Sequence, residues 1–155
     1  MSQDLEASII KALRRDGFKA TPQRIAIGQL ALSDQSHPRA QEVYEKVNAI
    51  YPTVSPATVY RTLQILKDVG LIQELGLPHD QSRFDSTMSP HINLVCMQCG
   101  SIKDLEQAGL QDMISGISSS ESFLPIGQRF DIYGICECCN KKREEGTATD
   151  QSASD

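Results

Sequence analysis

The first 80 residues of the chain carry apolar side chains at helical spacing. Leu5, Ile9 and Leu13 lie four residues apart, which predicts an amphipathic helix that Gly17 ends. Capping or proline residues open further predicted helices at Thr21 and Pro22, at Pro38, and at Ser55 and Pro56. The N-terminal region is therefore predicted to be helical.

The helix that opens at Ser55 has the clearest boundaries. Val59, Leu63 and Leu66 form an apolar stripe at spacings of four and three, and Gly70 ends the helix. The segments "LIQEL" and "SRFDS", joined by the turn-rich "GLPHDQ", then predict a two-stranded hairpin. Helices followed by such a hairpin are typical of a winged helix-turn-helix domain.

The polar face of this helix carries side chains that suit phosphate and base-edge contacts in a major groove. With Arg24 they form the predicted DNA-binding set, which is Arg24, Thr58, Tyr60, Arg61, Gln64 and Lys67. A solvated helix face is the alternative explanation for these residues. The neighbouring helices and the hairpin favour DNA binding.

The pattern becomes strand-like after residue 90. "HINLVC", "SIKDLE" and "RFDIYGIC" predict strands, and "LQDMISGI" predicts a short helix. The predicted fold is α+β, with a winged-helix domain over residues 1–85 and a small α/β domain over residues 86–143. The second domain is thinly packed, so it would gain from a metal ion and from pairing with a second copy.

The composition and net charge of the chain neither support nor exclude DNA as a partner. The chain of 155 residues has 39% hydrophobic side chains, enough for a core, and a net charge of -5. Much of that charge lies in residues 144–155, "EEGTATDQSASD", which predict a disordered acidic tail. No apolar run reaches membrane-spanning length and no cleavable signal is evident, so we expect a cytoplasmic protein without a membrane partner.

Cysteine spacing is the most specific chemical signal in the chain. Cys96 and Cys99, and later Cys136 and Cys139, form two Cys-x-x-Cys pairs that can place four thiolates around one zinc ion. A four-sulfur site has no open position, so its predicted role is structural. A redox disulfide is the alternative, and Cys138 is interpreted as a spare thiol.

Several motifs resemble the ferric uptake regulator family of metal-dependent repressors. They are, in order, "TPQR", "HPRAQEVY", "SPATVYRTLQIL", "SRFD", "HINLVCMQCG" and "YGICECC". The resemblance implies a homodimer with an N-terminal winged-helix domain that binds a double-stranded DNA operator, a C-terminal dimerisation domain and a regulatory metal ion. No small organic ligand is expected.

The family's peroxide-sensing branch holds iron or manganese with three histidines and two aspartates. The matching positions here are His37, Asp85, His91, Asn93 and Asp104. These nitrogen and oxygen donors suit Fe(II) or Mn(II) and differ from the soft cysteine site. Asn93 departs from the pattern, which has histidine there, and an amide oxygen is a weaker donor. His79 is a conceivable substitute, although a polar turn explains it better.

The resemblance implies that peroxide adds an oxygen to His37 or His91 when iron fills this site. Asp85 and Asp104 favour the peroxide-sensing branch, whereas Arg61 and Asn93 favour an iron-homeostasis repressor, and zinc- or nickel-sensing members are further alternatives. From other classes, a zinc-ribbon adaptor that binds only proteins would need neither Arg61 nor Lys67. A metalloenzyme is not expected, because no HExxH motif, nucleophile elbow or phosphate loop is present.

Overall fold

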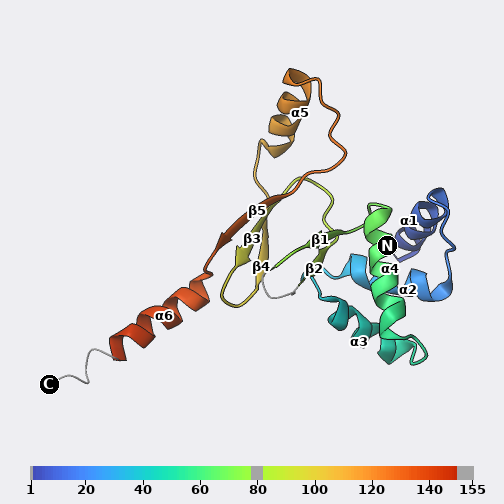
Figure 1. The fold of residues 1–155 in the computed structure, drawn as a ribbon, viewed down its shortest axis with the longest axis horizontal. Helices are drawn as coiled ribbons and strands as arrows, with labels where there is room; N and C mark the ends of the chain where they lie inside the picture. The colour runs from blue at the N-terminus through green and yellow to red at the C-terminus, as the bar shows by residue number, and fades with distance from the viewer. Residues whose placement is uncertain (1, 78–81, 150–155) are drawn as a thin grey trace. The chain divides into compact units, whose positions relative to one another are not determined.

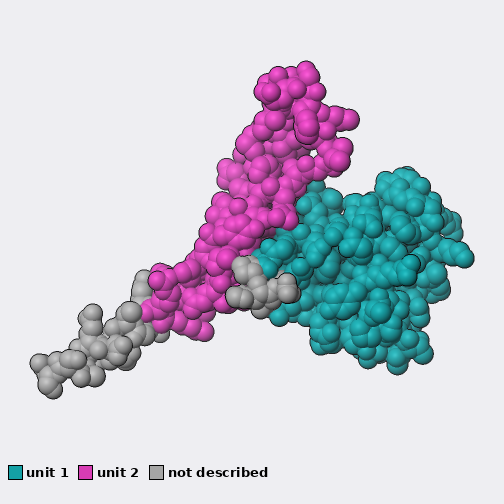
Figure 2. All heavy atoms as spheres, in the orientation of Figure 1, with its two compact units in different colours: residues 1–88 teal, residues 89–155 magenta. Residues whose placement is uncertain are grey.

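The computed structural model describes residues 2–77 and 82–149. The chain divides into two compact units, residues 1–88 and residues 89–155 (Figure 2). The division falls after Met88, whereas the sequence placed the domain boundary after residue 85. Each unit has its own set of helices and strands.

The described residues of the first unit form four helices and a small hairpin, which Figure 1 labels. Its elements are α1 (Ser2–Arg15), α2 (Pro22–Ser33), α3 (Ala40–Ile50), α4 (Pro56–Asp68), β1 (Gln73–Leu75) and β2 (Arg83–Asp85). The Thr21 and Ser55 side chains accept hydrogen bonds from Arg24 N and Thr58 N, so both predicted caps are present. β1 and β2 pair antiparallel, which confirms the winged helix-turn-helix architecture.

Helix α3 begins two residues later than the sequence predicted. Pro38 was expected to open it, but the helix starts at Ala40. His37 has a φ of 54°, in the left-handed region, and the Pro38 carbonyl accepts a hydrogen bond from Phe84 N at 3.0 Å. The chain at His37 and Pro38 is therefore held against β2 before the helix can begin.

Apolar side chains fill the first unit in two clusters. The larger joins α2, α3 and α4 to the hairpin, with Ile27, Val43, Leu63 and Ile72 fully or almost fully buried. The smaller cluster packs α1 against the end of α4. The stripe predicted from Val59, Leu63 and Leu66 is fully buried in the larger cluster.

The second unit is built on a three-stranded sheet in the order β4-β3-β5. Its elements are β3 (Ile92–Cys96), β4 (Ile102–Leu105), α5 (Leu110–Ser120), β5 (Phe130–Gly134) and α6 (Glu137–Thr149). β3 pairs antiparallel with β4 and parallel with β5. Figure 1 shows α5 within the long connection that carries the chain from β4 to β5.

Helix α6 corrects the prediction for the C-terminal region. Residues 144–149 were expected to belong to a disordered tail, but α6 continues to Thr149. The helix starts directly at the second cysteine pair, where Asn140 N donates to the Cys136 carbonyl at 2.9 Å. That fixed first turn removes part of the cost of helix nucleation. Residues 150–155 of the predicted tail lie outside the described residues.

The second unit has a thin apolar core. Among its described residues, the buried hydrophobic side chains are Val95, Cys96, Leu110 and Cys139. None of the described helices has the length and apolarity needed to cross a membrane.

Candidate metal centres and DNA-binding face

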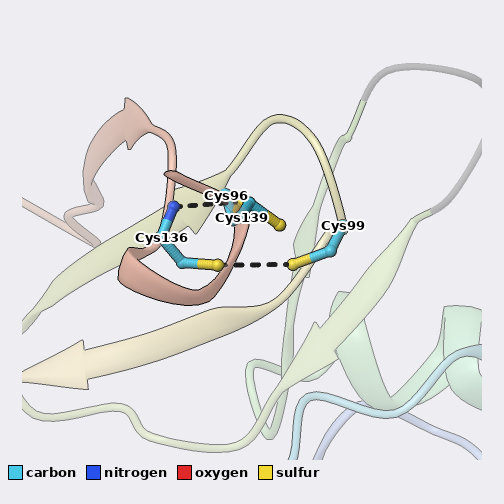
Figure 3. A group of neighbouring side chains, drawn as sticks. All are labelled: Cys96, Cys99, Cys136 and Cys139. Carbon is cyan, nitrogen blue, oxygen red and sulfur yellow. Dashed lines mark hydrogen bonds between the residues drawn. The ribbon is translucent and has the colours of Figure 1, made fainter. Parts of the chain in front are cut away.

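The four cysteines of the two pairs converge in the second unit (Figure 3). Cys96 ends β3, Cys99 lies in the following turn, Cys136 precedes α6 and Cys139 lies in its first turn. Their sulfur atoms all lie within 4.8 Å of one another, and Cys99 Sγ is 3.7 Å from Cys136 Sγ. Tetrahedral zinc with bonds of about 2.3 Å separates its sulfur ligands by about 3.8 Å, so the group fits this ion.

Local hydrogen bonds prepare part of this group for metal binding. The backbone N–H of Cys136 donates to Cys96 Sγ at 3.3 Å and lowers the pKa of Cys96 to about 6. A hydrogen bond with Ser101 lowers the pKa of Cys99. The Cys139 pKa is raised to about 12, first by its hydrogen bond with Cys136 and then by burial.

Four thiolates this close together would repel one another, so their joint ionisation calls for a compensating cation. A divalent ion compensates their charge, and the closed set of four sulfur ligands makes this a structural zinc site. The exposed Cys138 is not a member of the group.

His37 and Asp85 form the part of the predicted regulatory site that lies in the first unit. Their side chains are 3% and 2% exposed, and His37 Nε2 lies 3.8 Å from Asp85 Oδ1. The Arg83 guanidinium donates to the His37 carbonyl at 3.2 Å, and Thr87 N donates to Asp85 Oδ1 at 2.7 Å. The left-handed backbone of His37 is the kind of strained conformation that clusters at functional sites.

His91, Asn93 and Asp104 form the part that lies in the second unit. Asn93 is in the central strand, 1% exposed, with Asp104 of β4 directly opposite in the register. His91 precedes the strand and its Nε2 lies 3.3 Å from Asn93 Oδ1. His79, the conceivable substitute for Asn93, lies outside the described residues.

Both parts carry buried polar side chains, which are costly unless they are paired or bind metal. Their imidazole, carboxylate and amide donors fit Fe(II) or Mn(II) and contrast with the thiolates of the zinc site. The cofactors supported by the donor chemistry are therefore structural zinc and a regulatory iron or manganese ion.

Asp131 is a residue at this face that the sequence did not single out. It lies directly opposite Asn93 on β5 and accepts a hydrogen bond from Asn93 Nδ2 at 3.2 Å. Its carboxylate within the predicted strand "RFDIYGIC" suggested a polar contact. The sequence could not identify Asn93 as the partner, because that depends on how β3 and β5 pair.

The predicted DNA-binding residues occupy different environments on the first unit. Tyr60, Arg61 and Gln64 are exposed on α4. Lys67 Nζ donates to Glu74 of β1 at 2.8 Å, so the hairpin already engages it. Residues Tyr60 and Gln64 also line a groove of about 380 Å³ shared with the hairpin.

The two remaining DNA-binding candidates are held by local hydrogen bonds. Arg24 Nη1 donates to the Lys19 carbonyl at 2.8 Å, and half-buried Thr58 joins the Ser55 cap. Gln64 Nε2 likewise donates to Asp68 Oδ1 at 2.8 Å. Tyr60 and Arg61 are exposed at the centre of α4, where a duplex could reach them.

Known proteins resemble this chain in sequence and in fold. A model of the ferric uptake regulator family matches residues 15–133. The peroxide-responsive repressor PerR of Staphylococcus aureus (strain Mu50 / ATCC 700699) is 35% identical over 142 residues, covering 92% of this chain and 95% of that protein.

Two solved structures illustrate the structural likeness. The ferric uptake regulator Fur of Helicobacter pylori has a TM-score of 0.73 at 16% identity, covering 90% of this chain and 94% of that one. PerR from Streptococcus pyogenes has a TM-score of 0.50 at 28% identity, covering 87% and 92%. The chain therefore belongs to the ferric uptake regulator family and is a metal-dependent regulator.

Proposed function

We propose that the protein is a transcriptional repressor that binds a double-stranded DNA operator as a cytoplasmic homodimer. The winged-helix architecture of the first unit and the exposed side chains of α4 support DNA binding. Large apolar side chains of the second unit support pairing with a second copy, since Phe123, Leu124 and Ile126 are 62%, 82% and 101% exposed.

We also propose that the two sets of donors, most of them buried, bind one regulatory ion. His37 and Asp85 would supply ligands from the first unit, and His91, Asn93 and Asp104 from the second. An ion that needs both sets selects conformations in which the units are held together, which would fix the spacing of the two recognition helices in a dimer. Metal and DNA should then strengthen each other's binding by the same factor.

The observation that carries this function is the separation of two donor chemistries in one chain. Four thiolates form a closed site that stabilises the fold, whereas histidine, aspartate and asparagine form a set with the hard donors that Fe(II) and Mn(II) prefer. A purely structural protein would not need the second set.

Peroxide is the signal that we propose for this repressor. The likeness to the peroxide-responsive repressor of Staphylococcus aureus supports this assignment. Fe(II) bound at the regulatory site would reduce hydrogen peroxide. In the net reaction one peroxide oxygen is added to a ring carbon of His37 or His91, and the other leaves as water. The oxidised imidazole is a poorer ligand, so the ion and then the DNA are released.

Mass spectrometry of the metal-loaded protein tests this proposal. The zinc-containing dimer is loaded with Fe(II) or Mn(II), treated with a low dose of peroxide and digested. We expect one added oxygen on a peptide containing His37 or His91, with loss of DNA binding, in the iron form alone. The manganese form is the matched control. Iron-loaded protein that stays on DNA with both histidines intact would contradict peroxide sensing, and loss of DNA binding with both histidines intact would contradict oxidation at His37 or His91.

An iron-homeostasis repressor is the second candidate function. Arg61 and Asn93 both depart from the peroxide-sensing pattern, which favours this alternative. It predicts that Fe(II) retains the protein on DNA and that peroxide leaves the histidines unmodified. The same experiment therefore separates the two candidates.

A further inference from the structure

Asn93 lies between two carboxylate-bearing residues on one face of the sheet. In the register of the central strand, its partner on β4 is Asp104 and its partner on β5 is Asp131. Residues directly opposite each other on paired strands share a face. The side chain that departs from the family's histidine is thus placed in a row of acidic neighbours.

Hydrogen bonds define which end of the Asn93 amide faces which neighbour. Its Nδ2 donates to Asp131 Oδ1 at 3.2 Å, and its Oδ1 lies 3.3 Å from His91 Nε2. His91 Nδ1 lies 2.8 Å from the Ser89 carbonyl, which only accepts, so Nδ1 carries the proton. In the neutral ring, Nε2 therefore presents its lone pair to the amide oxygen.

This arrangement leaves two acceptors facing each other, and rotating the amide does not remove the mismatch. After a flip, Nδ2 would donate to His91, but Oδ1 would then face the Asp131 carboxylate. The charged carboxylate makes the stronger hydrogen bond with the amide N–H groups. Asn93 Oδ1 is consequently directed toward His91 Nε2, and either a proton on Nε2 or a metal ion bound by both atoms satisfies the pair.

The second carboxylate oxygen of Asp131, Oδ2, is held by two other side chains. Arg129 Nε lies 2.9 Å and the Tyr133 hydroxyl 3.0 Å from Asp131 Oδ2, and the Asp131 side chain is 9% exposed. These contacts leave Oδ1 directed at Asn93. The carboxylate thus has a fixed orientation before any metal binds.

We propose that Asp131 is a positioning residue that fixes the Asn93 amide as an oxygen ligand of the regulatory ion. This inference rests on the proposed regulatory site. Residues behind a metal ligand fix its orientation, and their loss commonly lowers metal affinity by about 10- to 100-fold. An amide oxygen is a weaker metal ligand than histidine, and Asp131 would compensate by holding Asn93 Oδ1 toward the ion.

A double-mutant cycle tests whether Asp131 acts through Asn93. Mn(II) affinity is measured by calorimetry on full-length, zinc-loaded protein for Asn93→Ala, Asp131→Ala and the double variant. We expect each single change to weaken binding about 10-fold or more, and the double variant to bind within about twofold of Asn93→Ala. Independent losses that multiply in the double variant would overturn the proposal.

Tyr133→Phe is the matched control, because it removes a contact to Asp131 Oδ2 and leaves the Asn93 contact in place. Its Mn(II) affinity should stay within about threefold of the parent. Asp131→Asn keeps an acceptor of the same shape and should fall between the parent and Asp131→Ala. The zinc content of each variant shows whether it has folded. If Asp131→Ala does not fold, Asp131→Asn takes its place, and a parental Mn(II) affinity of Asp131→Asn then rejects the proposal.

His37→Ala separates failure of this inference from failure of the proposed function. If His37→Ala leaves Mn(II) affinity unchanged, the shared regulatory site is wrong. If His37→Ala abolishes Mn(II) binding while Asp131→Ala binds like the parent, the regulatory site stands and the positioning role of Asp131 is wrong. Loss of affinity in both, with the nonadditive cycle, supports both proposals.

Discussion

The two units of the chain are stabilised in different ways. In the first, helices and hairpin enclose continuous apolar clusters that include Ile27, Leu63 and Leu66. In the second, two of the buried hydrophobic residues among those described are Cys96 and Cys139, which belong to the four-cysteine group proposed to bind zinc. Large apolar side chains such as Leu124 remain exposed there.

This difference indicates which interactions each unit needs in order to fold. Burial of apolar surface stabilises the first unit from within its own sequence. We propose that the second unit depends on an ion and on a second copy that covers its exposed apolar side chains. Conditions that remove metal should therefore act on one unit and spare the other.

The largest expected effect comes from breaking the zinc site. Cys96→Ser should abolish tight zinc binding and unfold the second unit, because structural zinc contributes about 10 kcal/mol or more to small domains. The helices of the first unit should persist, and the dimer should be lost. Metal analysis measures the zinc content, residue-resolved hydrogen exchange measures the folding of each unit, and sedimentation measures the dimer.

Cys138→Ser is the control for that experiment. It removes an exposed thiol outside the four-cysteine group, so zinc and the dimer should be retained. Equal damage from the two substitutions would mean that Cys138 is a ligand.

A core substitution in the first unit sharpens the same comparison. Leu63 is fully buried, and Leu63→Ala should lower the free energy of unfolding by about 2 to 5 kcal/mol. Leu124→Ala, at a site that is 82% exposed, should cost the isolated subunit little. Urea unfolding of the zinc-loaded protein measures the first effect, and urea unfolding at concentrations low enough to dissociate the dimer measures the second. A small effect of Leu63→Ala would contradict the account of the first unit.

Arg61 tests whether DNA recognition resides in the first unit alone. Arg61→Ala should weaken binding to a selected duplex by about 1 to 3 kcal/mol if the guanidinium contacts a base edge. Mn(II) affinity in the absence of DNA should be unchanged. Lys67→Ala should have a smaller effect, because Lys67 is already paired with Glu74. Fluorescence anisotropy measures both, and parental affinity in both variants would exclude α4 as the reading helix.

The Asp34 carboxylate should make a smaller, pH-dependent contribution to the stability of the first unit. Burial of Asp34 acts to raise its pKa, but hydrogen bonds from Lys46 and Ser36 outweigh it and lower the pKa from 3.8 to about 2. The stabilisation is therefore present above pH 3.8 and is lost as the pH falls toward 2. We expect Asp34→Asn to cost about 1 kcal/mol near neutrality, after allowing for solvent screening, and almost nothing near pH 2. A difference that does not change with pH would contradict this assignment.

Local signals explain which parts of the fold were predictable. The Ser55 cap and the apolar stripe of α4 identify a helix without tertiary information, and the paired cysteines identify the zinc site by spacing alone. The start of α3 was misplaced because the left-handed conformation of His37 depends on contacts with β2. Asp131 was missed because its contact with Asn93 joins strands 38 residues apart.

The continuation of α6 beyond the second cysteine pair was also unpredictable from local sequence. Its residues are polar and include Gly146, so composition favoured a disordered tail. The first turn of α6 contains Cys139, and the fold brings this residue together with Cys96, Cys99 and Cys136, which local sequence does not show.

The coupling between the regulatory ion and DNA is the most direct test of the central claim. A duplex selected from a random pool is titrated with the zinc-only dimer and with the same dimer loaded with Mn(II), and Mn(II) affinity is measured with and without the duplex. We predict tighter DNA binding by the manganese-loaded dimer, by the factor by which DNA tightens Mn(II) binding. Equal DNA affinity of the two forms would contradict the account.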